Sequence, residues 1–277
     1  MSLLLSIGCE ICHDSDLVNS AGTPSLDATE FLLMSLLTVQ LVPASKLPAR
    51  RTHWVSIFST VTDRLVHKYG VPSLGNLRDP VQEIFYIMLS ARTTDNQYRK
   101  TYRALRAKYP SLTDLAMASA EEILSCIRDG GLGKKRAAQL RGIAAALLAK
   151  FGNDPSRHLK NLSAREAFEL LNGLPGMGPK SALCVMMYSL NHDTFPVDTN
   201  VQRVASRLGA LSPRLKHWQA QQRLPALVPE GRSKELHIGL VVHGRTVCLP
   251  LKPRCDRCIL ADLCKYGKRR TAKARSK

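Results

Sequence analysis

A lysine, Lys180, stands at the start of a largely apolar stretch, directly after a turn rich in glycine and proline. The surrounding sequence is LPGMGPKSALCVMMYSL, residues 174–190. A lysine in this position can neutralise a phosphate, or it can act as a nucleophile once it has lost its proton. Which role applies depends on the turn before it and on the partners that the fold brings to it.

Four cysteines form a second group of reactive side chains near the end of the chain. Cys248, Cys255, Cys258 and Cys264 fall within 17 residues and are separated by six, two and five residues. Such a group is typical of a metal site, and nothing directs the chain to an oxidising compartment in which disulfides would form. The spacing alone favours tetrahedral zinc and an iron–sulfur cluster equally, because both accept four thiolates.

The turn before the lysine has the composition of a phosphate-binding hairpin between two helices. Gly176 and Gly178 allow a tight turn and a close approach of the backbone to an anion, and Pro179 suits the first position of the next helix. The free amides of that helix would face the phosphate, which positions DNA without reading bases. Ser163 and Glu166 form a capping-box pattern that predicts where the preceding helix starts. The alternative is a glycine-rich link between packed helices.

The rest of the chain predicts an all-α protein. Leu and Ala are abundant, aromatic residues are few, and hardly any stretch alternates as a strand does. Helical patterns broken by Pro or Gly follow one another. One covers residues 52–70 and ends at Gly70, and another begins with Asp79 as a cap and Pro80 at the first helical position.

Charge is distributed unevenly along the chain. The net charge is +18, yet residues 1–45 contain five acidic residues and no Lys or Arg, so the remainder carries +23. This excess predicts a polyanionic partner, with nucleic acid favoured over an acidic membrane surface. We expect residues 1–48 to be a poorly ordered acidic extension, or to reflect a start codon placed too far upstream. We expect residues 267–277 to be a flexible basic tail that contacts phosphate.

Together these features resemble the endonuclease III branch of the helix-hairpin-helix DNA glycosylases. After the hairpin and lysine in LPGMGPKSA, Asp198 follows Lys180 by eighteen residues within FPVDTNVQRVASRLG, and the four-cysteine loop comes last. The segments MLSARTTD, GGLGKKRAAQL and ELHIGLVVHGRTVC match as well. In the order of the family, the resemblance runs from about residue 53 to 266.

The resemblance implies an all-α, two-lobed helix-hairpin-helix DNA glycosylase fold. Residues 75–190 would form a helical barrel that ends in the hairpin, residues 49–74 with 191–266 would form the second lobe, and DNA would lie between them. The four-cysteine loop, residues 248–264, implies a [4Fe-4S] cluster rather than zinc. Because protein would occupy all four ligand positions, we expect the cluster to position DNA rather than to catalyse redox chemistry.

The resemblance also implies roles for Lys180 and Asp198. We expect the helix dipole and partial desolvation to lower the pKa of Lys180, so that a neutral amine attacks C1′ of deoxyribose and forms a Schiff base. Asp198 would stabilise positive charge on the sugar, and it also suits a helix N-cap. Relatives that only remove adenine usually lack this lysine. Lys180 therefore favours a bifunctional DNA glycosylase and AP lyase of base excision repair.

Three further positions bear on DNA and substrate. Leu132 in GGLGKK is the expected wedge that fills the gap left by a flipped nucleotide, with a buried leucine as the alternative. Arg92 stands where the family commonly has glutamine, which leaves the opposite-base preference open. Asn200 replaces a frequent histidine and, with ELH at 235–237, resembles plant 5-methylcytosine glycosylases. Oxidised or ring-saturated pyrimidines are the expected substrates, and methylated cytosine or mismatched thymine or uracil are the alternatives.

The expected partner is double-stranded DNA that contains a damaged base or an abasic site. We expect a monomer that is neither secreted nor bound to a membrane. A protein of another class, either a non-enzymatic DNA-binding module or an iron–sulfur redox sensor, would share many of these features. Covalent trapping with borohydride separates the classes, because only the enzyme forms a Schiff base.

Overall fold

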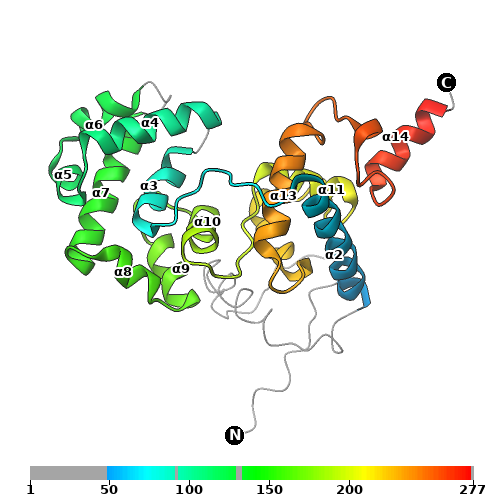
Figure 1. Ribbon diagram of the computed structural model, residues 1–277, viewed down its shortest axis with the longest axis horizontal. Helices are drawn as coiled ribbons and strands as arrows, with labels where there is room; N and C mark the ends of the chain where they lie inside the picture. Colours follow the sequence, from blue (N-terminus) through cyan, green and yellow to red (C-terminus); the bar gives the residue numbers. More distant parts are fainter. Residues whose placement is uncertain (1–48, 91–92, 129–132, 276–277) are drawn as a thin grey trace, which may run out of the picture.

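The computed structural model describes residues 49–90, 93–128 and 133–275, and helix is the regular secondary structure throughout this part of the chain. The helices form two lobes, which confirms the all-α, two-lobed prediction (Figure 1). The chain passes between the lobes at residues 70–79 and again at 190–198. No helix in the described ranges is both long enough and apolar enough to cross a membrane.

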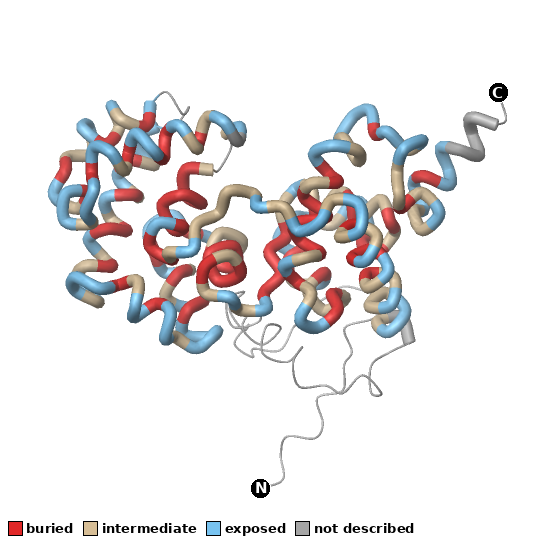
Figure 2. The backbone as a smooth tube through the Cα atoms, in the orientation of Figure 1, coloured by how far each residue is buried: buried red, intermediate tan, exposed pale blue. Residues whose placement is uncertain are grey.

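The first lobe contains the helices from α3 to α10. They are α3 (Pro80–Ser90), α4 (Asp95–Lys108), α5 (Leu112–Met117), α6 (Ala120–Ile127), α7 (Lys134–Phe151), α8 (Pro155–Lys160), α9 (Ala164–Asn172) and α10 (Pro179–Ser189). Their buried residues, where the backbone tube of Figure 2 is red, form one hydrophobic core. Phe85 of α3, Leu140 of α7, Phe168 of α9 and Val185 of α10 are at most 1% exposed, so these four helices enclose the centre of the lobe.

The second lobe combines the first described helix with the last ones. It contains α2 (Ala49–Tyr69), α11 (Thr199–Leu208), α12 (His217–Arg223), α13 (Ser233–Thr246) and α14 (Lys265–Arg275). Phe58 of α2, Val201 of α11 and Leu240 of α13 are fully buried in its separate core. A Cβ on Gly239 of α13 would come within 2.8 Å of Leu65 on α2, so the glycine allows these two helices to pack closely.

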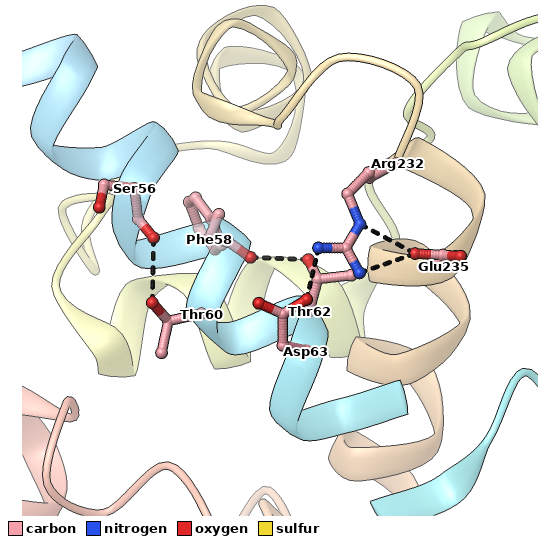
Figure 3. A network of polar contacts seen from close by, with 7 residues as sticks. All are labelled: Ser56, Phe58, Thr60, Thr62, Asp63, Arg232 and Glu235. Atoms are coloured by element: carbon pink, nitrogen blue, oxygen red, sulfur yellow. Dashed lines mark hydrogen bonds and ion pairs between the residues drawn. The ribbon is translucent and has the colours of Figure 1, made fainter. Parts of the chain in front are cut away.

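Polar contacts complete the junction between α2 and α13. Arg232, at the N-cap of α13, donates to Asp63 of α2 at 2.6 Å and to Glu235 of its own helix at 2.9 Å (Figure 3). The hydroxyl of Thr62 donates back to the Phe58 carbonyl at 2.6 Å, which satisfies a polar group that is fully buried. The N-terminal helix is thereby attached to the C-terminal half of the chain.

The residues predicted from the sequence to start or cap helices do so in the structure. Ser163 and Glu166 form the expected capping box at α9, Pro179 is the first residue of α10, and Asp79 accepts from the Gln82 amide at 2.9 Å. The basic segment after residue 266 differs from the expectation, because it continues α14 as a helix through Arg275. The boundaries of 75–190 for the barrel and 49–74 with 191–266 for the second lobe stay predictions.

Candidate active site and cysteine loop

The hairpin between α9 and α10 rests on α7. Gly176 has a φ of 72°, a conformation that glycine adopts most readily, and a Cβ there would overlap the Gln139 side chain of α7. A Cβ on Gly142 of α7 would lie 3.2 Å from Pro175, so a glycine also makes room for the hairpin from the other side. A Cβ added to Gly178, the N-cap of α10, would have no neighbouring atom within 4 Å. Backbone atoms of the hairpin are therefore accessible to a ligand.

Lys180 is half-buried in the first turn of α10. Its pKa lies above the ordinary value, chiefly because of the charge that the Cys184 thiol can carry, and the carboxylate of Asp198 acts in the same direction. Desolvation and the nearby charge of Arg245 oppose this shift. The prediction of a lowered pKa is therefore wrong. Neighbouring side chains stabilise the ammonium form more than desolvation and the charge of Arg245 disfavour it.

The thiol of Cys184 is itself protonated near neutral pH. It is almost fully buried one helical turn after Lys180, and burial raises the pKa of this thiol. Lys180 offsets part of that effect through its charge and through a hydrogen bond with the thiol. The resting pair is thus an ammonium next to a neutral thiol.

Asp198 is half-buried and forms the N-cap of α11. One carboxylate oxygen accepts from the Val201 amide at 2.8 Å, and the other accepts from the side chain of Asn200 at 3.1 Å. Burial alone would raise the pKa of Asp198, but the charge of His237, these two hydrogen bonds and the charge of Lys180 outweigh it and lower the pKa. Asp198 is therefore ionised at neutral pH, with its two oxygens held in place.

Two buried titratable groups near this pair, Glu83 and His237, were not predicted from the sequence to be partners of Lys180 or Asp198. Glu83 of α3 is fully buried, and burial raises its pKa to about 7, against the charge of Lys180. His237 of α13 is 3% exposed and its ring nitrogen Nδ1 donates to the Pro196 carbonyl at 2.8 Å, while burial lowers its pKa to about 4. A single acid within the apolar run of α3 was the available signal for Glu83.

The four cysteines Cys248, Cys255, Cys258 and Cys264 line one pocket, together with Arg207. Zinc would draw four thiolates to within about 4 Å of one another. In the described part of the chain, no three His, Cys, Asp or Glu side chains are grouped so as to hold a single ion. The four cysteines therefore share one pocket, without a single-ion site among the described residues.

The pocket also supplies hydrogen bonds to sulfur. Arg207 donates to the Cys248 sulfur at 3.2 Å, and the Gly267 amide donates to the Cys264 sulfur at 3.3 Å. The sulfur of Cys258 lies 3.4 Å from Nε2 of His243. Such bonds stabilise the negative charge that thiolates carry as metal ligands.

Two of the predicted DNA contacts, Arg92 and Leu132, lie outside the described residues. Lys180 and Asp198 are brought together by the fold, since each charge shifts the pKa of the other. The cysteines form a separate group in the second lobe. The structure thus presents a lysine–aspartate pair beside a helix-hairpin-helix and, apart from it, a four-thiol loop.

The matches to known families agree with this arrangement. Residues 85–230 match the family described as the HhH-GPD superfamily base excision DNA repair protein, and the chain belongs to this superfamily. Within the superfamily, it is 31% identical over 186 residues to the endonuclease III of Synechocystis sp., which covers 67% of this chain and 80% of that protein. It is 29% identical over 192 residues to the endonuclease III of Thermotoga maritima, covering 69% and 85%. The chain is a member of the endonuclease III family and a DNA glycosylase of base excision repair.

Solved structures give the same result for the fold. A non-covalent complex of endonuclease III with DNA superposes with a TM-score of 0.69 at 25% identity, covering 78% of this chain and 98% of that chain. A thermostable thymine-DNA glycosylase superposes with a TM-score of 0.65 at 25% identity, covering 79% and 97%. The thymine/uracil-DNA glycosylase of Methanothermobacter thermautotrophicus is 29% identical over 192 residues, covering 68% and 83%.

Proposed function

We propose that this glycosylase is bifunctional: Lys180 removes the damaged base through a Schiff base and then cleaves the strand as an AP lyase. The observation that carries the proposal is the pairing of a half-buried lysine in the first turn of α10 with the ionised, doubly hydrogen-bonded carboxylate of Asp198. A lysine that only contacts phosphate would need no carboxylate beside it. An amine nucleophile benefits from one, because positive charge develops on the sugar as the base leaves.

The chemistry requires Lys180 to lose its proton first, because the resting group is an ammonium. The lone pair of Nζ then forms a bond to C1′ while the bond from C1′ to the base breaks, and its electron pair leaves with the base. The attached amine then loses a proton, its lone pair breaks the bond from C1′ to O4′, and O4′ takes up a proton, which opens the sugar and gives the Schiff base. Loss of a proton from C2′ expels the 3′ phosphate, and water releases the lysine. Asp198 stabilises the cationic sugar in the first step.

The hairpin would hold the DNA backbone during these steps. Gly176 and Gly178 are exposed at the start of α10, where backbone amides attract a phosphate. By family resemblance, Leu132 and Arg92 would enter the space left by the flipped nucleotide. Double-stranded DNA with a damaged base or an abasic site is thus the proposed ligand.

The four-cysteine loop would bind a [4Fe-4S] cluster. Cys248, Cys255, Cys258 and Cys264 would be its ligands, and the hydrogen bonds from Arg207 and Gly267 would stabilise two of their sulfurs. When bound, the cluster would cross-link the loop, and protein would occupy all of its ligand positions. We therefore propose that it shapes the DNA-binding surface of the second lobe.

Oxidised or ring-saturated pyrimidines are the proposed substrates. Mismatched thymine or uracil is a second candidate, because one similar protein is named a thymine/uracil-DNA glycosylase. Methylated cytosine is a third candidate, on the resemblance of Asn200 and residues 235–237 to plant 5-methylcytosine glycosylases.

The test is borohydride trapping on a panel of duplexes that carry thymine glycol, a G·T or G·U mismatch, 5-methylcytosine or an abasic site. We expect a covalent complex with thymine glycol and with the abasic site, and none with Lys180→Gln. Lys234→Gln is the matched control, since Lys234 is an exposed lysine at the second position of α13. Binding of the duplexes without any trapped complex would contradict the lyase proposal and favour a non-enzymatic DNA-binding protein.

A further inference from the structure

We propose that Asn200 is a positioning residue that fixes the carboxylate of Asp198, and that Arg203 links this carboxylate to the four-cysteine loop. The inference rests on the proposed catalytic role of Asp198 and adds the side chains that hold it. Asn200 is half-buried in the first turn of α11, two residues after Asp198.

The amide of Asn200 lies between a cation and an anion. Its Nδ2 donates to Oδ2 of Asp198 at 3.1 Å, and its Oδ1 accepts from Nη2 of Arg203 at 2.8 Å. A guanidinium can only donate and an ionised carboxylate can only accept. The orientation of the amide is therefore determined by its two neighbours, and each of the two hydrogen bonds involves a charged group and is strengthened by it.

Arg203 is in turn held by two other segments of the second lobe. Its Nε donates to the Cys248 carbonyl at 2.9 Å, and its Nη2 donates to the Gly244 carbonyl of α13 at 2.8 Å. A Cβ on Gly244 would lie 2.8 Å from Cβ of Asn200 and 3.1 Å from the guanidinium, so α13 packs directly against this pair. Cys248 is the first cysteine of the loop, and a chain of hydrogen bonds thus runs from the loop to Asp198.

Asn200 and the Val201 amide together hold both oxygens of the Asp198 carboxylate. The Val201 amide holds Oδ1 of Asp198 as a helix cap, and Asn200 holds Oδ2, so rotation of the carboxylate is restrained at both oxygens. The other titratable or charged groups that interact with Asp198 are Lys180, Cys184 and Tyr188 of α10, Arg203 of α11 and His237 of α13. These groups act on Asp198 through their charge, whereas Asn200 donates a hydrogen bond to it, so Asn200 is the side chain positioned to orient the carboxylate.

The experiment compares Asn200→Asp, Asn200→Ala and Gln202→Ala in the full chain. The aspartate variant keeps the size of the side chain but places an acceptor opposite Asp198. Gln202→Ala is the control, because Gln202 lies on the same helix and donates its amide to the Leu215 carbonyl at 2.9 Å, away from Asp198. For both Asn200 variants we expect the single-turnover rate of Schiff-base formation to fall on the order of tenfold, with DNA affinity unchanged. For Gln202→Ala we expect the wild-type rate.

A second measurement does not depend on catalysis. The carboxyl-carbon NMR titration of Asp198, assigned by its loss in Asp198→Asn, should move to higher pH in Asn200→Ala, because a hydrogen bond to the charged form is lost. Arg203→Met should cause a shift of the same sign. An unchanged titration in Asn200→Ala, or an equal shift in Gln202→Ala, would overturn the inference. If the wild-type protein traps no substrate but the titration moves as expected, the proposed function fails and the positioning by Asn200 stands.

Discussion

The fully buried carboxyl group of Glu83 accepts a hydrogen bond from the side-chain amide of Asn76, in the segment that passes from the second lobe to the first. The amide of Leu77 donates to the other carboxyl oxygen at 2.7 Å. One acidic side chain in α3 therefore anchors the crossing segment, and it does so close enough to Lys180 for the lysine charge to lower its pKa.

Glu83 should make stability depend on pH. Burial raises its pKa from an ordinary 4.5 to about 7, so the folded state disfavours the ionised form. Below the pKa that Glu83 has in the unfolded state, the carboxyl group is protonated in both states and its burial costs nothing in ionisation. Above the pKa that it has in the folded state, the folded protein bears the full cost of a buried carboxylate. Relative to Glu83→Gln, wild-type protein should lose about 3 kcal/mol of unfolding free energy between pH 4.5 and pH 7. Urea denaturation of both proteins across this range measures the difference. Parallel stability curves would show that Glu83 titrates normally.

Cys184→Ala should change the pH dependence of Schiff-base formation. The charge that Cys184 can carry is the largest contribution that raises the pKa of Lys180. The thiol can carry this charge only at alkaline pH, so its removal should move the alkaline rise of the single-turnover rate to lower pH, because more of the lysine is then neutral in that range. Cys126→Ala is the control, since Cys126 is a half-buried cysteine of α6. An identical pH profile in wild type and Cys184→Ala would mean that the thiol does not affect the lysine.

The two hairpin glycines should respond differently to alanine. Gly176 has a φ of 72°, so Gly176→Ala should destabilise the fold by about 1 kcal/mol or more. Gly178 has a φ of −95° and open space around a Cβ, so Gly178→Ala should keep the melting temperature. Its methyl group would nevertheless stand where a phosphate approaches, and DNA affinity should fall. Thermal melts and binding to an undamaged duplex test both statements. Unchanged DNA binding by Gly178→Ala would argue against a phosphate at the hairpin.

Replacement of a loop cysteine should remove the proposed metal centre. We expect purified wild-type protein to be brown with visible absorbance from the proposed cluster, and Cys258→Ser to lose most of it. Cys184→Ser is the matched control, because Cys184 lies in the first lobe and not in the pocket of four thiols. Stoichiometric zinc in a colourless wild-type protein would contradict the iron–sulfur assignment.

The local features of this fold follow from short-range sequence signals. The capping box of Ser163 and Glu166, the helix start at Pro179 and the N-cap at Asp198 each depend on residues within three positions of one another. The spacing of the four cysteines marked them as one group, and family motifs added the pairing of Lys180 with Asp198. The same capping signal at Ser111 and Asp114 marks α5, which we did not predict.

The charge states of the site were decided by the tertiary structure. The helix dipole predicted a lowered pKa for Lys180, but its actual neighbours include Asp198, which belongs to the following helix. Glu83 accepts a hydrogen bond from the crossing segment, and His237 donates one to a carbonyl 41 residues earlier in the chain. The burial of these two side chains and the partners they bind therefore depend on the folded structure. Electrostatic effects depend on distance in space and on loss of water, and neither follows from sequence spacing. The sequence by itself determined which groups could react, and the packing of the two lobes decided their protonation states.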